Sequence, residues 1–191
     1  FPEERITPEQ LEAFKNIVER RKAGEPLAYI TGIKEFYGLT LEVTPDTLIP
    51  RDDTEIIVEA AFAKIEQIRG KIEASSPLSL LDLGTGSGAI ALAVKKHFPD
   101  ITMTAVDLHP KTLAIAEKNA KNNNLQIEFI ESDWFSALGE RRFDIILSNP
   151  PYIDPIDPHL TGDGVKFEPT RALIADQKGL ADLYHIIEIA P

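Results

Sequence analysis

The sequence contains no cysteine among its 191 residues, and this absence excludes several kinds of chemistry at once. Disulfide bonds, thiolate metal ligands and cysteine nucleophiles are all impossible, and a chain without cysteine suits the reducing cytoplasm. We therefore expect a cytoplasmic protein. The histidines have neither metal-ligand spacing nor an accompanying Ser/His/Asp set, so we expect no metal site at His97, His109, His159 or His185.

Long hydrophobic runs and positive charge are both scarce. The longest uncharged stretch in the first hundred residues, 83–94, has 12 residues, whereas a membrane span needs roughly 18, so we expect none. The 20 Lys and Arg stand against 31 Asp and Glu, a net charge of −11, which argues against a protein that mainly neutralises the phosphates of a duplex. Phe1–Glu4 have neither an initiator methionine nor a secretory signal, so we expect a chain cut at its front.

The N-terminal part predicts a capped helix and then a β-hairpin. Thr7 suits the N-cap, Pro8 suits the first helical position, and Gln10 can reach back to the cap. The helix is expected to end before Gly24, and its expected apolar face consists of Leu11, Phe14, Ile17 and Val18. The aromatic and β-branched stretch 36–43 around a glycine predicts the hairpin, which we expect to act as a linker.

From Pro77 onward, short apolar runs alternate with helical stretches. The expected strands are 78–83, 101–106, 127–130 and 143–147, and the expected helices between and after them are 89–96, 111–122 and 178–190. Another helix is expected to start near Asp52 or Asp53. Strands that alternate with helices predict a parallel sheet with right-handed crossovers and helices on both faces, which is a Rossmann-like α/β fold.

A glycine-rich loop, LDLGTGSG (81–88), joins the first expected strand of this sheet to a helix. Gly84, Gly86 and Gly88 allow a tight turn and let a ligand approach backbone N–H groups at the start of a helix, although such a turn can need glycine for steric reasons alone. Asp107 ends the next strand 23 residues after Gly84, close to the roughly 20 expected for a carboxylate that binds ribose hydroxyls. A cofactor that contains a nucleoside is the favoured interpretation.

The identity of this cofactor depends on the acidic residues around the loop. A dinucleotide also suits the glycines, but Asp82 favours S-adenosylmethionine because a carboxylate attracts its cationic ammonium and sulfonium groups. The alternative is that Asp82 caps the loop at the strand end. Asp133 and Trp134 follow the third strand, where Asp133 can accept from the adenine amino group and Trp134 can lie against the ring or be partly buried in the core.

The segment SNPPYID (148–154) follows the fourth strand of the sheet. Its two prolines fix the loop and remove two donors, so carbonyl oxygens remain as free acceptors. If Asn149 and Pro150 accept the two N–H bonds of a planar amino group, they hold it and stabilise the positive charge that develops during methyl transfer. Tyr152 can stack on the target. The alternative is an ordinary Pro-Pro turn with Tyr152 partly buried.

These motifs together resemble the class I S-adenosylmethionine-dependent methyltransferases that act on planar nitrogens. GEPLAYITG (24–32), TLIPRDDTE (47–55) and VKFEPTRALIAD (165–176) resemble, more narrowly, the protein-(glutamine-N5) methyltransferase family, PrmC/HemK. The resemblance implies an enzyme that methylates the glutamine of the Gly-Gly-Gln motif in class 1 peptide-chain release factors and releases S-adenosylhomocysteine. The segment Phe167-Glu168-Pro169 matches a family element near the substrate entrance, although it can equally be a turn.

The resemblance also implies roles for individual residues. Cofactor binding is expected at Asp82, Gly84, Thr85, Gly86, Ser87, Gly88, Asp107, Asp133, Trp134 and Asn149. Catalysis is expected at Asn149, Pro150 and Tyr152, and these residues together with Pro151 are expected to bind the substrate glutamine.

Three parts are expected along the chain: part of a helical substrate-recognition domain (1–32), the hairpin linker (33–50) and a methyltransferase domain (51–191). The family's sheet has seven strands and only four are predicted here, so we expect the C-terminal strands to be missing and the 145–147 strand to be an unpaired apolar edge. An inactive but binding-competent fragment is one alternative. An enzyme that methylates a nucleobase amino group is another, but the net charge of −11 disfavours direct nucleic-acid binding. We expect a monomer.

Overall fold

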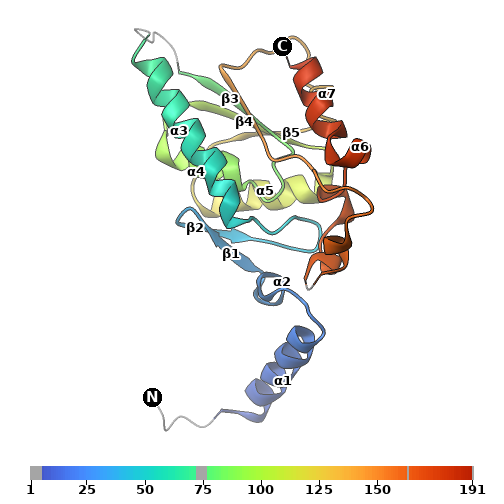
Figure 1. Ribbon diagram of the computed structural model, residues 1–191. Coiled ribbons are helices and arrows are strands. Elements are labelled where there is room, and N and C mark those ends of the chain that lie inside the picture. The colour runs from blue at the N-terminus through green and yellow to red at the C-terminus, as the bar shows by residue number, and fades with distance from the viewer. Residues whose placement is uncertain (1–5, 72–76, 163, 191) are drawn as a thin grey trace.

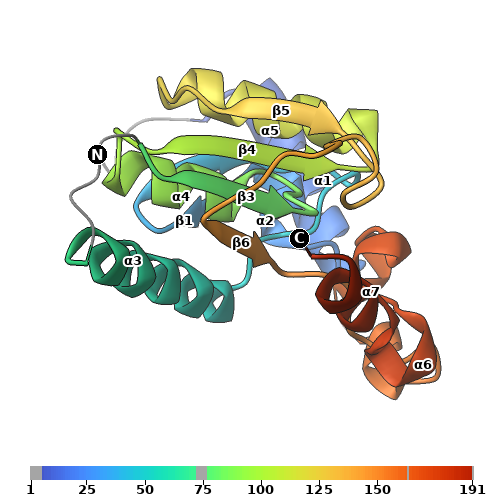
Figure 2. The ribbon, with the colours of Figure 1, turned by 90° about the horizontal axis from the view of Figure 1, so that it is seen from above.

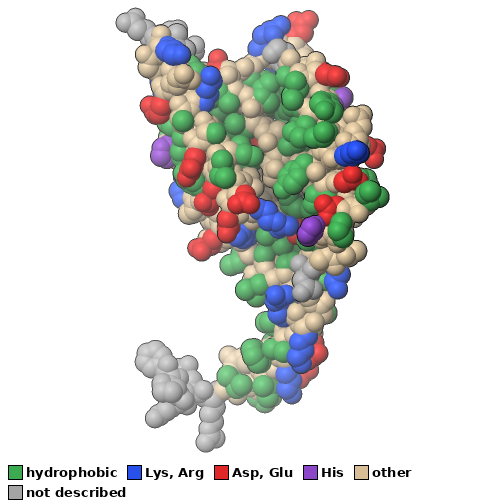
Figure 3. Space-filling model, in the orientation of Figure 1, with side chains coloured by type: hydrophobic (Ala, Val, Ile, Leu, Met, Phe, Trp, Pro, Cys, Tyr) green, Lys and Arg blue, Asp and Glu red, His purple; other side chains and the backbone are tan. Residues whose placement is uncertain are grey.

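The computed structural model describes residues 6–71, 77–162 and 164–190, so the prediction for Phe1–Glu4 lies outside it. Helix α1 (Pro8–Lys22) carries the predicted capping box: the Thr7 hydroxyl accepts from the Gln10 amide at 3.2 Å, and the Gln10 side chain accepts from the Thr7 amide at 2.9 Å. None of its residues is buried, and Leu11, Phe14 and Ile17 of its apolar face are exposed. Figure 3 shows hydrophobic side chains on the surface at the α1 end of the molecule. None of the helices in the described ranges is long and apolar enough to cross a membrane.

Helix α2 (Leu27–Thr31) leads into the predicted hairpin, whose antiparallel strands are β1 (Ile33–Phe36) and β2 (Leu39–Glu42). The hairpin therefore starts at Ile33 rather than at Phe36. Its turn places Gly38 at a φ of 68°, where a glycine costs little. Phe36, Leu39 and Leu41 join the main hydrophobic core with residues of the sheet and its helices. The hairpin is thus packed into the body of the molecule.

The predicted parallel sheet is present, with strand order β5-β4-β3-β6. Its elements, with the helices that connect them, are α3 (Glu55–Arg69), β3 (Ser79–Leu83), α4 (Ala89–His97), β4 (Thr102–Asp107), α5 (Pro110–Asn122), β5 (Glu128–Glu131) and β6 (Ile145–Ser148). A short 3₁₀ helix (Asp52–Thr54) precedes α3. β6 forms one edge of the four-stranded sheet, as expected.

The two faces of the sheet are covered unequally (Figures 1 and 2). Leu80, Met103 and Ala105 pack on one face into the core that α3, α4 and the hairpin share. Leu81 and Val106 point to the other face, which is covered by the segment after β5 and by Ile186 of α7 (Ala181–Ile189). Helices on both faces were predicted, and the structure confirms this only in part. The helices α3, α4 and α5 all contribute to the core on the first face, and among the described residues the other face receives one helical side chain, Ile186 of α7.

The C-terminal helix differs from its prediction, which started at residue 178. The backbone of Gln177 and Lys178 has φ values of 54° and 59°, so the chain is kinked within the short element α6 (Asp176–Gly179) and α7 begins at Ala181. At helical spacing, the predicted apolar face of this helix consists of Leu180, Leu183, Ile187 and Ala190, and most of it is exposed, with Ile187 at 72%. The periodic pattern identified a helix correctly. Within the described part of the chain, however, this helix packs on the second core cluster through Ile186, which is partly buried and is not one of these four residues.

A buried amide ties the hairpin to the glycine loop. Asn119 of α5 is fully buried and accepts from the Glu42 amide at 2.7 Å. Its side-chain nitrogen donates to the carbonyls of Glu42 and Ser87, each at 2.9 Å. These three bonds satisfy most of its hydrogen-bonding capacity, so β2, α5 and the glycine loop are held together at one point.

Candidate functional site

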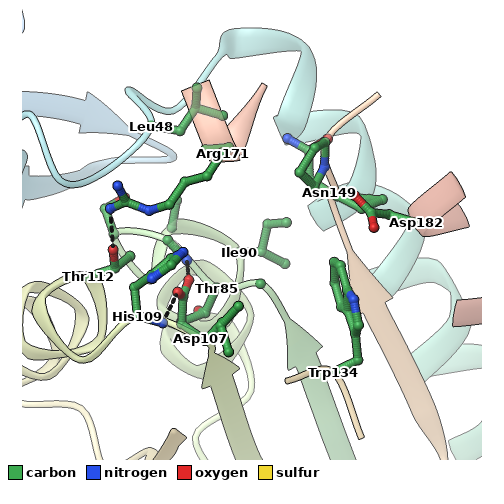
Figure 4. A pocket seen from close by; sticks show the side chains of 18 of the residues that line it. Leu48, Thr85, Ile90, Asp107, His109, Thr112, Trp134, Asn149, Arg171 and Asp182 are labelled. Carbon is green, nitrogen blue, oxygen red and sulfur yellow. Dashed lines mark hydrogen bonds between the residues drawn. The ribbon is translucent and has the colours of Figure 1, made fainter. Parts of the chain in front are cut away.

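A cavity of about 370 Å³ lies at the carboxyl ends of the parallel strands, where ligands bind in open α/β sheets. The strand wall consists of the residues that follow three strands of the sheet: Gly84–Ser87, Asp107–His109 and Ser132–Trp134. The loop wall consists of Asp46, Leu48, Pro50 and Thr54 from the segment after the hairpin, and of Arg171 and Ala172. Asn149, Pro150 and Pro151 also line the cavity. Figure 4 shows Leu48 and Arg171 across the cavity from Asp107.

The glycine loop has the conformation that its sequence predicts. Gly84, Gly86 and Gly88 have φ values of 66°, 60° and 86°, a region that other residues rarely adopt. A Cβ atom on Gly88 would lie 2.5 Å from the Leu92 side chain and 3.3 Å from that of Ala116. Gly88 therefore permits α4 to pack against α5, and it does not line the cavity, whereas Gly84, Thr85, Gly86 and Ser87 do.

Asp107 is the last residue of β4 and contributes a buried carboxylate to the strand wall. Its two oxygens accept from the backbone amides of Gly86 and His109, each at 3.0 Å (Figure 4). Burial raises the pKa of Asp107, and these two hydrogen bonds oppose the rise. Each carboxylate oxygen keeps a further lone pair, so Asp107 can still accept from a hydroxyl group of a ligand in the cavity.

Asp82 lies elsewhere than its predicted role requires. It is 1% exposed and does not line the cavity. One of its oxygens accepts from the Thr85 hydroxyl at 2.6 Å and from the Ala91 amide at 3.3 Å, and the other has no hydrogen-bond partner among the described residues. Burial raises the pKa of Asp82 to about 7. Side chains alternate along a strand, so Asp82 faces α4 with Leu80 and caps the glycine loop from behind, which was the alternative interpretation.

Asp133 and Trp134 both line the cavity, as predicted. Trp134 has a φ of 48°, an unusual value for a large side chain. Its ring passes close to Gly84, where an added Cβ would lie 3.6 Å from a ring carbon. The other side of Trp134 packs against the second core cluster, with Leu81 and Val106. Partial burial in the core is therefore confirmed for the only tryptophan, and its ring also borders the cavity, so its contact with adenine stays a prediction.

The Asn149–Pro151 loop joins the two walls. It follows β6, which pairs with β3 of the strand wall, and the Asn149 side-chain nitrogen donates to the Thr54 hydroxyl of the loop wall at 3.5 Å. This bond leaves the side-chain oxygen of Asn149 free to accept. Tyr152 does not line the cavity and is 60% exposed. The structure therefore brings Asn149 and Pro150 to the cofactor loop and leaves Tyr152 just outside.

Several cavity residues were not predicted from the sequence. They are Asp46, Leu48, Pro50, Thr54, Ala89, Ile90, Leu108, His109, Thr112, Ser132, Arg171, Ala172 and Asp182. Part of the signal was present, because segments 47–55 and 165–176 carry the family resemblance although no single residue in them indicates a ligand. Asp182 of α7 lies beside Asn149 (Figure 4), and burial raises its pKa, with a further contribution from the negative charge of Asp133.

The Phe167-Glu168-Pro169 segment packs against the loop wall and is also part of a turn, because it ends a short 3₁₀ helix (Val165–Phe167). The Glu168 side chain is 3% exposed and forms an ion pair with Arg51. Its second oxygen accepts from the Ile49 amide at 3.1 Å. Phe167 packs with Tyr29, Val43 and Ile49 in a third apolar cluster, so this segment holds the stretch of chain that lines the cavity.

Comparisons with solved structures identify the class of the fold. The catalytic domain of hMettl16 in complex with the MAT2A 3′UTR hairpin 6 covers 80% of this chain and 56% of its own, with a TM-score of 0.58 at 19% identity. An S-adenosylmethionine-dependent methyltransferase from Agrobacterium tumefaciens covers 64% of this chain and 40% of its own, with a TM-score of 0.51 at 20% identity. The fold is thus that of the class I, Rossmann-like methyltransferases.

Sequence comparisons identify the family. The model of the methyltransferase small domain matches residues 70–161, and that of the PrmC N-terminal domain matches residues 1–32. Proteins named release factor glutamine methyltransferase match all of this chain: 48% identical and 66% covered in Salmonella typhimurium, and 47% identical and 67% covered in Pasteurella multocida. The chain belongs to the release factor glutamine methyltransferase family. It spans about two thirds of the length of these relatives.

Proposed function

We propose that this chain carries the cofactor-binding and catalytic parts of an enzyme that methylates the side-chain amide nitrogen of glutamine in the Gly-Gly-Gln motif of class 1 peptide-chain release factors. The observation that carries the proposal is the position of Asn149 and Pro150, which line the same cavity as the glycine loop and Asp107. The names of the relatives support the substrate. The enzyme is proposed to act in the cytoplasm as a monomer.

The residues around the cavity fit S-adenosylmethionine. Asp46, Asp107, Asp133 and Asp182 line the cavity together with one arginine, Arg171. Carboxylates attract a ligand with ammonium and sulfonium groups and repel a pyrophosphate, so this lining favours S-adenosylmethionine over a dinucleotide. These four carboxylates, rather than Asp82, would attract the cationic groups of the cofactor.

The strand wall would supply contacts for most parts of the cofactor. The part of the glycine loop that lines the cavity, Gly84 to Ser87, would hold the methionine part through its backbone. Asp107 would accept from the ribose hydroxyls. Asp133 and Trp134 would hold the adenine, and Asn149 would lie at the methionine end. Bound in this cavity, S-adenosylmethionine supplies an electrophilic methyl group.

Asn149 and Pro150 would do the chemical work on the substrate. An amide nitrogen is a poor nucleophile because its lone pair is delocalised into the carbonyl group. If the Asn149 side-chain oxygen and the Pro150 carbonyl accept the two N–H bonds of glutamine, they fix its nitrogen in the cavity. The same oxygens stabilise the positive charge that develops on that nitrogen during transfer.

The other predicted residues would support this step. Pro150 and Pro151 fix the shape of the loop, because each ring fixes its own φ. Tyr152 lies at the outer edge of the loop, where its ring can stack on the incoming glutamine. The net charge of −11 supports a protein substrate over a nucleic-acid strand, which would require a basic approach surface.

The proposal is tested by methyl transfer from labelled S-adenosylmethionine to a purified release factor. We expect one label per release factor, at the glutamine of Gly-Gly-Gln, and no label when that glutamine is replaced by alanine. A release factor in which a surface glutamine outside the motif is replaced serves as the control and should be labelled normally. Equal labelling of the Gly-Gly-Ala variant would overturn the proposed substrate.

A further inference from the structure

One residue of the segment after the hairpin, Ile49, is held at both its amide and its carbonyl by an ion pair between the buried Glu168 and the partly exposed Arg51. The carboxylate of Glu168 accepts from the amide of Ile49 at 3.1 Å, and the guanidinium of Arg51 donates to the carbonyl of the same residue at 3.0 Å. Glu168 and Arg51 also bind each other. Ile49 itself is buried, and its two neighbours in the chain, Leu48 and Pro50, line the cavity.

We propose that Glu168 is a positioning residue for the cofactor: by holding Ile49 and Arg51, its carboxylate keeps Leu48 and Pro50 in the loop wall. This inference rests on the proposed function, because it takes S-adenosylmethionine as the ligand of the cavity. Glu168 acts through the backbone of the loop and does not itself line the cavity.

The chain after Glu168 extends the effect to the catalytic loop. Arg171 and Ala172, shortly after Glu168, line the cavity. The carbonyl of Leu173 then accepts from the amides of Tyr152 and Ile153 at 3.2 and 2.9 Å. A single segment therefore joins the loop wall, through Glu168, to the loop that carries Asn149. A change at Glu168 is expected to alter the shape of the cavity on two sides.

Other contacts keep the loop wall folded when Glu168 is replaced. The Tyr29 hydroxyl donates to the Thr47 carbonyl at 2.6 Å. The Thr112 hydroxyl and the Arg171 guanidinium both donate to the Asp46 carbonyl at 2.8 Å. Because these anchors do not involve Glu168, we expect its removal to loosen Leu48 and Pro50 rather than to unfold the chain.

The test compares Glu168→Ala, Glu168→Gln and a control, Asp52→Asn, by calorimetric titration with S-adenosylhomocysteine. Asp52 pairs with Lys34 on the same stretch of chain, but its side chain is 87% exposed. We expect Glu168→Ala to raise the dissociation constant about tenfold with one site per chain, because a buried amide and a guanidinium lose their acceptor. Glu168→Gln keeps an oxygen for Ile49 and should recover most of the affinity. The control should stay within about twofold, as for an exposed ion pair.

Kinetics separate positioning from a purely structural role. We expect Glu168→Ala to raise KM for S-adenosylmethionine about tenfold while kcat at saturation stays within about threefold. An unchanged dissociation constant, or a loss of binding sites without a loss of affinity, would overturn the proposal.

If Glu168→Ala does not fold, Arg51→Met carries the same test, with an expected loss of about threefold, and wild-type affinity in that variant would overturn the proposal. S-adenosylhomocysteine binds without a release factor. A failure of methyl labelling would therefore overturn the proposed substrate, and the dissociation constants for S-adenosylhomocysteine would still test the role of Glu168.

Discussion

The two walls of the cavity are built by different means. In the strand wall, each lining segment directly follows a strand of one parallel sheet, so the register of β3, β4 and β5 sets the positions of its residues. Backbone hydrogen bonds between these strands hold this wall, and the Asp107 side chain adds two bonds, from the amides of Gly86 and His109. The loop wall has no strand beneath it, and single side chains from distant segments hold it, such as Glu168 at Ile49 and Arg171 at Asp46.

This difference indicates how each wall responds to change. Many backbone hydrogen bonds fix the strand wall. A single substitution there is therefore expected to remove a contact with the ligand and to leave the shape of the cavity unchanged. In the loop wall, each buried polar contact contributes about 1 kcal/mol to stability, and losing one is expected to change the local shape. Four substitutions test this contrast, ordered by the size of their expected effect.

The largest effect is expected where the walls meet. Asn149→Ala removes an oxygen that accepts from the substrate amide, and loss of one such preorganised contact lowers kcat about a hundredfold or more. Methyl transfer at saturating S-adenosylmethionine measures it. The affinity for S-adenosylhomocysteine should change less than tenfold by comparison, and Asn122→Ala, at an exposed position of α5, should behave like the wild type. A loss of affinity as large as the loss of rate would show that Asn149 acts mainly on the cofactor.

In the strand wall, Asp107→Ala should weaken binding without changing the fold. A hydrogen bond to a charged group contributes about 1.5–3 kcal/mol, so the dissociation constant for S-adenosylhomocysteine should rise about thirtyfold. Asp100→Ala is the control, because that carboxylate is exposed and pairs with Arg69 before β4. Wild-type affinity in Asp107→Ala would contradict the assignment of the ribose to this wall.

Asp82 lies behind the strand wall, so replacing it is expected to change the free energy of unfolding rather than the affinity for the cofactor. Burial raises its folded pKa to about 7, whereas an unfolded aspartate titrates near 3.9. Folding therefore favours the protonated form, and this contribution to stability is complete below about pH 4 and is lost as the pH rises through about 7. Between pH 5 and pH 8, the free energy of unfolding of the wild type should fall by roughly 2 kcal/mol relative to Asp82→Asn, which cannot ionise.

Urea unfolding of both proteins at the two pH values measures that difference. Groups other than Asp82 titrate alike in the two proteins and cancel. A difference that stays constant with pH would mean that Asp82 is ionised throughout and has a cationic or water partner that satisfies its second oxygen.

The smallest effect is expected in the loop wall at Thr54. Thr54→Val keeps the shape of the side chain but removes the hydroxyl that accepts from Asn149 at 3.5 Å. Because this bond is long, we expect kcat to fall only about threefold, with an unchanged KM for S-adenosylmethionine. Thr40→Val, at an exposed position of β2, is the control. A rise in KM with constant kcat would instead assign Thr54 to cofactor binding.

The contrast between the walls also explains what the sequence could predict. The glycine loop, Asp107 and Asn149 are local signals, since each follows a short apolar strand directly. Leu48 and Arg171 are ordinary residues in their own segments, and they reach the cavity only because Glu168 and the hairpin bring distant parts of the chain together. Whether Asp82 reaches the cavity depends on the face of β3 that it occupies. Side chains alternate along a strand, so the sequence already places Asp82 on the same face as the apolar Leu80. The exposure of most of the apolar face of α7 could not be inferred from periodicity, which identifies an apolar side but not what covers it.

Asn119 couples the motion of the hairpin to that of the glycine loop. Its amide bonds both the Glu42 peptide of the hairpin and the Ser87 carbonyl of the glycine loop, so neither can separate from α5 without leaving a buried polar group of Asn119 unsatisfied. Opening of the hairpin or of the glycine loop thus requires the free energy to break hydrogen bonds of Asn119. The two segments are therefore expected to fluctuate as one cooperative unit. The hairpin that joins α2 to the sheet is therefore also part of what keeps the glycine loop closed.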